Sequence, residues 1–296
     1  WQPIHSLSLT WTGGIGGNTC YILPNNKSEL AQLLSYCNNN KISTFFAGSG
    51  SNLLVSDDGF KGVVISLKKT FKALKISKEG IINAESGVML GNLVKNAMKA
   101  NIIGLESLIG VPGTLGGALI MNAGAYGSEI SNYFLSADMM HMDGKIETLT
   151  NKTIKFSYRT STFPKDQILI NAKFKCKLGN QDEITKNKQR ASLERKTKQP
   201  LKFRSAGSIF KNPKNGVAAG YLIDKAGLKG LKSGNAQISE KHANFIINRG
   251  DAKSEDVLKL INIAKKEVLN KYSIHLKLEV KLLGFNRNIM NDVLYD

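Results

Sequence analysis

Four glycine-rich segments in the first half of the chain are the residues best suited to hold a ligand. They are residues 13–17, 48–52, 110–117 and 122–127. Because glycine adds no Cβ and accepts positive φ, its backbone N–H groups can approach a phosphate closely. One such segment is as consistent with a tight turn as with a binding loop. Four of them favour a phosphate-binding site over turns alone.

The spacing of these glycines excludes the two common motifs that bind a phosphate with one loop, the dinucleotide-binding fingerprint and the Walker A motif. Gly48-x-Gly50 lacks the third glycine of a dinucleotide fingerprint and runs into the apolar residues 53–55 and an Asp58-Gly59 turn, where a helix would be required. The sequence contains no Walker A motif. A cradle built from several loops on a mixed sheet is what a long, bent cofactor such as FAD would require.

The surrounding patterns predict a sheet-rich region interrupted by two amphipathic helices. Strands are expected at residues 42–47, 62–67, 73–77 and 80–85. One helix follows a Ser28 cap, with Leu30, Leu33, Leu34 and Cys37 on its apolar face, and the other has Leu90, Leu93, Val94, Ala97 and Met98.

A hairpin and a buried strand are predicted next. Residues 135–142 and 145–149 flank Asp143-Gly144, a dipeptide that tolerates the positive φ of a tight turn. The alternation of Ile168, Ile170, Ala172, Phe174, Cys176 and Leu178 predicts one buried strand face. Residues 180–198 are highly charged, which predicts a polar helix or linker and a domain boundary.

Beyond that boundary, short strands and one long helix are expected. The strands are placed at residues 208–211, 236–239, 244–248 and 276–283, and the helix is opened by Ser254. In the last strand, the apolar positions from Leu276 to Leu282 face one way, and Glu279 and its lysine neighbours face the other. The tail after Phe285 is expected to fray.

Composition limits the class of protein. The chain has 296 residues, a net charge of +18 and no apolar run near the roughly 18 residues that span a bilayer. The first residues carry no secretion signal, and three separated cysteines indicate neither a disulfide scaffold nor a metal site, which fits a reducing cytoplasm. The positive charge would attract nucleic acid, but the lysines are dispersed and no nucleic-acid-binding motif is present, so no nucleic-acid partner is expected.

Seven segments resemble, in order, the motifs of the UDP-N-acetylenolpyruvoylglucosamine reductase family. The resemblance covers nearly the whole chain, from about residue 16 to residue 284. The segments are Gly48-Ser-Gly-Ser-Asn-Leu-Leu-Val55, Gly110-Val-Pro-Gly-Thr-Leu-Gly-Gly117, Asn122-Ala-Gly-Ala-Tyr-Gly127, Tyr158-Arg159-x-Ser161, Gln199-Pro200, Ala206-Gly-Ser-Ile-Phe-Lys-Asn-Pro213 and Ser239-Glu-Lys-His-Ala-Asn-Phe245.

The resemblance implies an α+β fold. It implies a vanillyl-alcohol-oxidase-type (PCMH-type) FAD-binding domain at residues 1–180, with subdomains at about 1–68 and 69–180. A smaller α+β substrate-binding domain at 181–285 and a tail at 286–296 would follow. Only about forty residues separate Arg159 from Gln199, too few for the tyrosine-bearing insertion of some members, so the chain resembles the shorter type.

The same resemblance implies the reaction and its cofactors. The expected activity is reduction of UDP-N-acetylglucosamine enolpyruvate to UDP-N-acetylmuramate in peptidoglycan synthesis, with non-covalent FAD and with NADPH as co-substrate. The FAD-binding residues carried over are Gly48, Ser49, Gly50, Ser51, Asn52, Gly110, Pro112, Gly113, Thr114, Gly116, Gly117, Asn122, Ala123, Gly124 and Gly127.

Three side chains are carried over as catalytic, and they are expected to converge on the flavin. Arg159 would meet the charge that develops on the substrate carboxylate, Ser208 would donate the proton, and Glu279 is the C-terminal catalytic glutamate. Ser208 is a weak acid, so a neighbour such as Lys211 would have to ease its ionisation. The family usually has Glu-Pro where this chain has Lys277-Leu278, which puts the surroundings of Glu279 in doubt.

The substrate contacts implied by the resemblance are Lys198, Lys211, Asn212 and His242. Cations suit a diphosphate, and amide or imidazole groups suit uracil. The other histidines form no cluster, so neither a metal nor covalent attachment of the flavin is expected. A cytoplasmic monomer without membrane insertion is expected. Two alternatives remain open: another FAD-dependent oxidoreductase of the same fold, and a non-catalytic basic nucleotide-binding protein.

Overall fold

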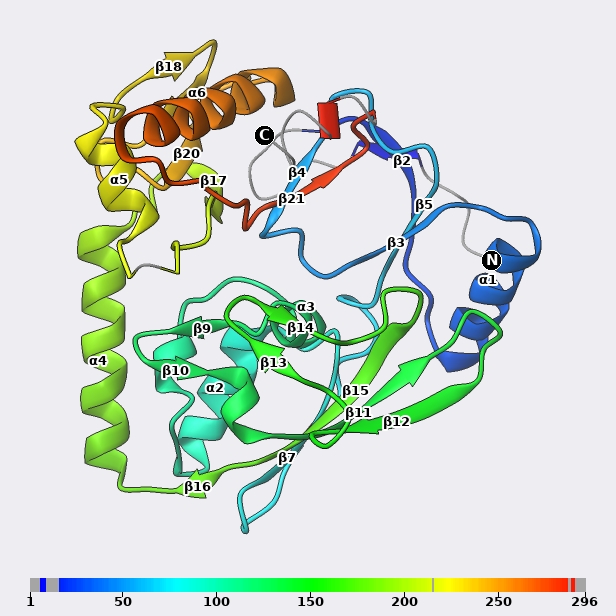
Figure 1. The fold of residues 1–296 in the computed structure, drawn as a ribbon. Helices are drawn as coiled ribbons and strands as arrows, with labels where there is room; N and C mark the ends of the chain where they lie inside the picture. Colours follow the sequence, from blue (N-terminus) through cyan, green and yellow to red (C-terminus); the bar gives the residue numbers. More distant parts are fainter. Residues whose placement is uncertain (1–5, 9–15, 215, 287–288, 291–296) are drawn as a thin grey trace. The chain divides into compact units, whose positions relative to one another are not determined.

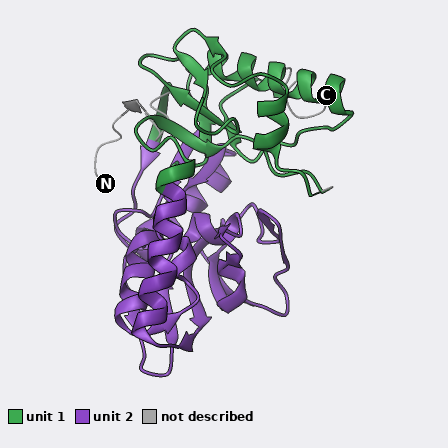
Figure 2. Cartoon of the chain, turned by 90° about the vertical axis from the view of Figure 1, so that its left-hand side faces the viewer, with its two compact units in different colours: residues 1–20, 50–61, 196–296 green, residues 21–49, 62–195 purple. Residues whose placement is uncertain are grey.

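The chain divides into two compact units, which a computed structural model describes for residues 6–8, 16–214, 216–286 and 289–290. Unit 1 comprises residues 1–20, 50–61 and 196–296, and unit 2 comprises residues 21–49 and 62–195 (Figure 2). The predicted glycine segment at 13–17 lies outside the described residues except for Gly16 and Gly17. Most of the predicted tail also lies outside them.

Unit 2 is built on an antiparallel sheet with the strand order β12-β11-β15-β7-β6 (Figure 1). Its strands are β6 (Leu74–Ile76), β7 (Ile81–Glu85), β11 (Phe134–Met140), β12 (Ile146–Thr150) and β15 (Ile168–Lys175). Helices α2 (Leu90–Lys99) and α3 (Leu115–Ile120) contribute apolar side chains to the same core as the sheet. Burial of the predicted apolar face of α2 confirms that helix.

The predicted face of β15 is confirmed only up to Cys176. Leu178, expected on the same buried face, is 55% exposed. The reason is that β15 ends at Lys175 and the next residues form a separate strand, β16 (Lys177–Leu178), paired with β8 (Ile102–Ile103). The alternation therefore does not continue through the break.

Helix α1 (Lys27–Asn39) buries its predicted apolar face, but its cap differs from the prediction. The N-cap is Asn26, whose side-chain oxygen accepts the N–H of Glu29 at 3.0 Å. Ser28, predicted as the cap, lies inside the first turn, because an asparagine two residues earlier already satisfies the exposed N–H group. Nearby, β3 (Thr44–Ala47) and β5 (Val63–Ser66) pair in parallel.

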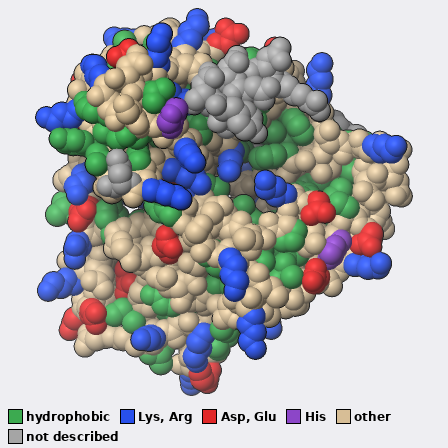
Figure 3. Space-filling model, in the orientation of Figure 1, with side chains coloured by type: hydrophobic (Ala, Val, Ile, Leu, Met, Phe, Trp, Pro, Cys, Tyr) green, Lys and Arg blue, Asp and Glu red, His purple; other side chains and the backbone are tan. Residues whose placement is uncertain are grey.

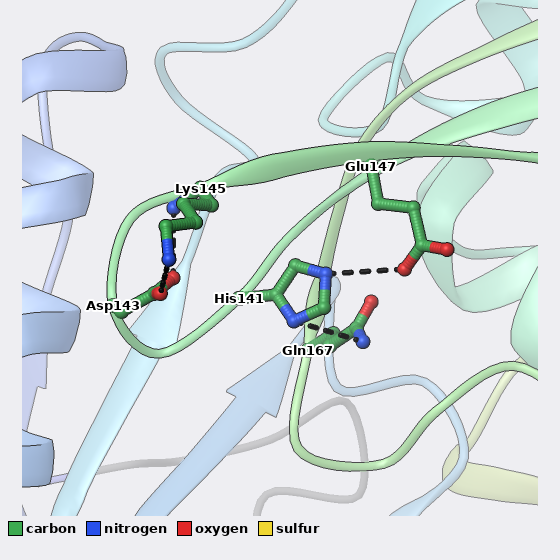
Figure 4. Close-up of polar contacts among 5 residues, drawn as sticks. All are labelled: His141, Asp143, Lys145, Glu147 and Gln167. Carbon is green, nitrogen blue, oxygen red and sulfur yellow. Dashed lines mark hydrogen bonds and ion pairs between the residues drawn. The ribbon is translucent and has the colours of Figure 1, made fainter.

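The predicted hairpin joins β11 to β12, and its turn is held by a polar cluster (Figure 4). Gly144 takes a φ of 85°. His141 lies between two partners, with Nε2 3.1 Å from Glu147 Oε2 and Nδ1 3.2 Å from Gln167 Nε2. Lys145 Nζ lies 3.1 Å from Asp143, whose pKa is lowered by hydrogen bonds from the backbone and side chain of Lys145. These contacts fix the tip of the hairpin.

Unit 1 contains an antiparallel sheet with the order β17-β20-β19-β18. Its strands are β17 (Arg204–Ser208), β18 (Lys232–Ser233), β19 (Ala236–Ile238) and β20 (Phe245–Asn248). Helices α5 (Ala219–Lys225) and α6 (Ser254–Tyr272) join the strands in one apolar core. In the same unit, β4 (Leu53–Val55) pairs in parallel with β21 (Lys281–Leu283).

Two strand predictions in unit 1 were wrong in extent. The strand expected at 208–211 is β17, which runs from Arg204 to Ser208. Its register with β20 shifts between Ser205 and Ser208, where Gly207 has a φ of 80°, and this irregular pairing leaves no simple alternation in the sequence. The strand expected at 276–283 is divided into a single bridge at Leu278, paired with Phe210, and the short strand β21.

The charged segment predicted as a helix or linker is the helix α4 (Gln181–Lys198). Only Ile184 and Ala191 are buried along it. The remaining elements are short. They are β1 (Ser6–Ser8), β2 (Asn18–Ile22), η1 (Glu106–Leu108), β9 (Gly124–Ala125), β10 (Ser128–Glu129), η2 (Ile130–Tyr133), β13 (Phe156–Ser157) and β14 (Thr160–Ser161).

Lys and Arg side chains are dispersed over the face shown in Figure 3, with Asp and Glu among them. Within the described ranges, no helix has both the length and the apolar character needed to cross a membrane. Over those same residues, His, Cys, Asp and Glu form no group of three that could bind a metal ion.

Candidate active site

The first predicted FAD loop, residues 48–52, passes from unit 2 to unit 1, and its unit 2 part lies against the second loop. A Cβ on Gly48 would lie 2.5 Å from the Thr114 hydroxyl oxygen, closer than real Cβ contacts allow. Ser66 Oγ donates to the Gly48 carbonyl at 3.2 Å. Gly48 therefore has to be glycine for the two loops to approach each other.

The second loop, residues 110–117, is fastened to the turn between β7 and α2. Leu90 N donates to the Gly113 carbonyl at 2.9 Å, and Gly116 N donates to the Ser86 carbonyl at 2.9 Å. Gly110 and Gly113 have φ values of 79° and 139°. Thr114 is the N-cap of α3. These bonds hold the loop in a glycine-specific conformation.

The third loop, residues 122–127, meets the hairpin of β13 and β14. Asn122 is fully buried at a φ of 44°, and its Nδ2 donates to Glu129 Oε2 at 2.7 Å and to the Ser157 carbonyl at 3.1 Å. Ser161 Oγ donates to the Ile120 carbonyl at 2.7 Å. Unit 2 thus brings the Asn122 loop and the Tyr-Arg motif into direct contact.

Arg159 occupies the turn of that hairpin with a φ of 54°. Its Nη2 donates to the Gly124 carbonyl at 2.8 Å, and its guanidinium carbon lies 5.0 Å from the centre of the Tyr158 ring. A carbonyl and an aromatic face fix the direction of the guanidinium plane. The side chain is partly buried, so its charge lies on the surface of this loop cluster.

Ser208 and Glu279 are brought together within unit 1. Glu279 N donates to the carbonyl of Ile209, the residue after Ser208, at 2.8 Å, and Lys211 N donates to the Lys277 carbonyl at 2.8 Å. The segments 208–211 and 277–280 therefore run side by side. Both Ser208 and Glu279 are partly buried. Arg159 belongs to unit 2.

A buried asparagine that the sequence reasoning missed holds the segment after Ser208. Asn244 accepts the Phe210 N–H at 2.9 Å and donates from Nδ2 to the Phe210 carbonyl at 2.8 Å. Its own carbonyl accepts the Ile209 N–H at 2.9 Å. In the sequence, only its place in the motif at 239–245 indicated that Asn244 could belong to the site.

Arg195 was also missed. Its Cδ would lie 3.2 Å from a Cβ on Gly110, so this α4 side chain packs against the second loop. Burial lowers the pKa of Arg195, and nearby Tyr126 acts in the opposite direction. An arginine stays protonated at neutral pH even so. The loop therefore has a permanent positive charge beside it.

The four predicted substrate residues lie at different places. Asn212 is exposed, and its Oδ1 accepts the Ala219 N–H at 3.1 Å at the start of α5. Lys198 is exposed at the end of α4, and Lys211 is partly buried beside Lys277.

His242 is partly buried. Burial lowers its pKa most strongly, the positive charge of Lys229 acts in the same direction, and a backbone hydrogen bond opposes them. Its Nδ1 accepts the Asn244 N–H at 3.2 Å, and its ring packs edge-on against Phe245. The lowered pKa favours the neutral ring, and because Nδ1 accepts the Asn244 N–H, that neutral form carries its proton on Nε2, where it can be donated.

The described residues include polar atoms suited to a bound group. Ser49 Oγ, Asn122 Oδ1 and Tyr21 Oη are buried and have no hydrogen-bond partner in the part of the chain that the structure describes. Leaving such an atom unpaired costs about 1–3 kcal/mol. Two of the three belong to the predicted loops, so the loops fit a ligand with several polar groups.

Comparison with known proteins gives matches over most of the chain. A family model described as "FAD binding domain" matches residues 19–150. A second, described as "UDP-N-acetylenolpyruvoylglucosamine reductase, C-terminal domain", matches residues 199–283. The two matched regions follow each other in the order expected for a cofactor domain and a substrate domain.

Curated relatives and a solved structure match at nearly full length. The UDP-N-acetylenolpyruvoylglucosamine reductase of Clostridium botulinum (strain Alaska E43 / Type E3) is 41% identical over 272 residues, covering 91% of this chain and 88% of the relative. That of Clostridioides difficile (strain 630) is 41% identical, covering 89% and 86%. The crystal structure of the Thermus caldophilus enzyme superposes with a TM-score of 0.80 at 35% identity, covering 93% and 96%.

Proposed function

The chain belongs to the UDP-N-acetylenolpyruvoylglucosamine reductase family, and from this membership we propose which of its residues carry out the family's reaction. The protein is an FAD-dependent oxidoreductase of peptidoglycan synthesis. It uses NADPH to reduce UDP-N-acetylglucosamine enolpyruvate to UDP-N-acetylmuramate. The full-length similarity to curated relatives is the observation that carries this conclusion.

The predicted glycine loops are the proposed FAD site. The Gly48 backbone lies so close to the Thr114 hydroxyl that a larger residue at position 48 would be blocked. Ser49 Oγ and Asn122 Oδ1 are buried polar atoms without protein partners in the described structure. Phosphate and ribityl oxygens suit N–H groups and hydroxyls of this kind. The chemistry that FAD supplies when bound, after reduction by NADPH, is a hydride, which no side chain can donate.

Arg159 is proposed to bind the carboxylate of the substrate. Reduction of the enolpyruvyl double bond places negative charge on that carboxylate in the transition state. A guanidinium already oriented by the Gly124 carbonyl can receive this charge without reorganising. Its planar pair of donors matches the two carboxylate oxygens, which a lysine ammonium would not.

Ser208 is proposed to deliver the proton to the second alkene carbon. A serine hydroxyl is a weak acid, so the transfer needs a strongly basic acceptor and a group that stabilises the alkoxide. Lys211 follows closely along the same segment and is the cation proposed for that role. Asn244 keeps this segment in place through its two bonds to Phe210.

Glu279 is proposed as the third catalytic side chain. Its backbone is bonded to Ile209, so the carboxylate and the Ser208 hydroxyl come from adjacent, paired segments. That pairing supports the carry-over in spite of the unusual Lys277-Leu278 sequence before it.

The UDP part of the substrate is proposed to bind to Lys198, Lys211, Asn212 and His242. The neutral His242 ring offers an N–H to a uracil carbonyl, and the lysines suit the diphosphate. We also propose that the protein is a cytoplasmic monomer. The division into an FAD-binding domain at 1–180 and a substrate domain at 181–285 remains a prediction.

A spectroscopic titration tests the function. The purified protein should be yellow, lose its flavin absorbance with NADPH under anaerobic conditions, and recover it when UDP-N-acetylglucosamine enolpyruvate is added. Recovery with oxygen alone, and none with the enolpyruvyl substrate, would identify an oxidase of the same fold. Absence of flavin binding after addition of FAD would leave only a nucleotide-binding role.

A further inference from the structure

Asn52 makes contacts that a cofactor-loop residue does not require. It ends the loop 48–52 and precedes β4 directly. Its side-chain Nδ2 donates to the backbone carbonyl of Glu279 at 3.0 Å, although the two residues are 227 positions apart in the chain. Its own carbonyl accepts the Lys281 N–H at 3.0 Å. One residue therefore holds the chain on both sides of Val280.

The Glu279 backbone is thus held at both of its polar groups. Its N–H donates to the Ile209 carbonyl at 2.8 Å, and its carbonyl accepts from Asn52. The first bond fixes Glu279 relative to the Ser208 segment. The second fixes it relative to the end of the glycine loop. All of these residues belong to unit 1.

Glu279 does not belong to a continuous strand. The regular strand β21 begins only at Lys281, and Leu278 forms a single isolated bridge. Glu279 lies in the irregular stretch between them, where no continuous ladder sets the direction of the side chain. A side-chain amide in the position of a missing ladder partner supplies that restraint.

We propose that Asn52 is a positioning residue for Glu279, which joins the flavin-binding loop to the catalytic carboxylate through one side-chain amide. This rests on the catalytic role proposed above for Glu279.

The test compares Asn52→Asp and Asn52→Ser with the parent enzyme. Both remove the amide N–H donor. The first places an oxygen opposite the Glu279 carbonyl, and the second leaves only a hydroxyl on a shorter side chain. Because small displacements of a catalytic group are costly, kcat should fall about 10²-fold. With FAD at a saturating concentration, the KM for the enolpyruvyl substrate and the rate of flavin reduction by NADPH should stay close to the parent values. Parent-like flavin reduction also shows that the variants fold. Loss of flavin reduction by NADPH from both variants at saturating FAD would overturn the proposal.

The pH dependence of Asn52→Asp separates positioning from general weakening. A protonated carboxyl can again donate to the Glu279 carbonyl, and an ionised one cannot. The ratio of variant to parent kcat should therefore rise as the pH falls from about 6 towards about 4, because a carboxyl with the ordinary aspartate pKa of about 3.9 gains its proton only near that pH. A constant ratio, with kcat lowered equally at every pH, would contradict the positioning role.

A double variant distinguishes failure of this inference from failure of the proposed function. If Asn52 acts through Glu279, Asn52→Asp combined with Glu279→Gln should be no slower than Glu279→Gln alone. A multiplicative loss would overturn the inference and leave the role of Glu279 intact. Unimpaired turnover in Glu279→Gln would instead remove Glu279 from the mechanism.

Gln237→Glu is the matched control. Gln237 Nε2 donates to the Gly230 carbonyl at 3.0 Å, so the substitution removes a bond of the same type and length from the same unit. The unfolding temperature of the Gln237→Glu variant can fall, but the kcat of this variant and its pH dependence should equal those of the parent. A kcat loss equal to that of Asn52→Asp would show that any lost amide bond in this unit has the same effect, and would overturn the proposal.

Discussion

Gly48 lies so close to Thr114 that a single added carbon would be 2.5 Å from the threonine hydroxyl. The same hydroxyl is the cap of α3, where it accepts the Gly117 N–H at 3.4 Å. The two loops of the proposed flavin site are therefore in contact through Gly48, which has no side chain, and Thr114, whose hydroxyl is held by the bond to Gly117.

Gly48→Ala should destabilise the protein and weaken flavin binding. The added methyl group has to displace Thr114, so overpacking should cost about 1–3 kcal/mol. Thermal unfolding and the bound FAD per chain measure the effect. Gly91→Ala is the control, because a Cβ at Gly91 in α2 meets nothing within 4 Å, and alanine should stabilise the helix by about 1 kcal/mol. Equal unfolding temperatures for the two variants would contradict the close approach.

Arg159→Lys should lower kcat although the charge is kept. A lysine cannot present two parallel donors to a carboxylate, and it loses the fixed bond to Gly124. The loss should be about 10²–10³-fold, as for removal of a donor to a developing oxyanion. Flavin reduction by NADPH should remain near the parent rate. If Arg159→Lys and the parent turn over equally, Arg159 acts only as a positive charge.

Ser208→Ala should leave the NADPH half-reaction intact and stop turnover of the enolpyruvyl substrate. Loss of a positioned proton donor should cost about 10²–10⁴-fold in the reoxidation step. Stopped-flow measurement of both half-reactions tests this. Ser205→Ala, in the same strand and paired with Ile247, is the control and should react normally. Normal reoxidation in Ser208→Ala would remove Ser208 from the mechanism.

Stability should decrease as the pH falls, in part because of His242. Its folded pKa lies below the unfolded value, mainly because of burial. The unfolded chain therefore binds the proton more readily. The stabilisation is fully present above the unfolded pKa of about 6.5 and is lost as the pH falls towards the folded pKa. Chemical unfolding of parent and His242→Gln across this range should show a smaller slope in the variant, and identical slopes would argue against a buried neutral ring.

The sequence predicted best those elements that are decided by local chemistry. The apolar face of α2 and the turn at Asp143-Gly144 are confirmed because period and turn residue alone determine them. Strand β17 was placed too late, at 208–211 in place of Arg204–Ser208, because its register shift depends on pairing with β20. Leu178 was predicted to be buried, but the alternation did not reveal that the strand ends before it.

The motifs of the candidate site could be located in the sequence, but not the contacts between them. The Gly48–Thr114 approach and the Asn244–Phe210 pair join segments far apart in the chain, and no local pattern encodes them. The same holds for Arg195, whose packing on Gly110 depends on where α4 lies. Their structural roles follow from tertiary contacts alone.

The parallel pairing of β4 with β21 also constrains how the protein is made. Leu53–Val55 leaves the ribosome well before its partner Lys281–Leu283 is synthesised. The chain that carries Gly50 and Asn52 must therefore wait for that distant segment before β4 can pair with it. Expression of residues 1–180 alone would leave β4 without this partner, because a cut at α4 separates the two strands of the pair.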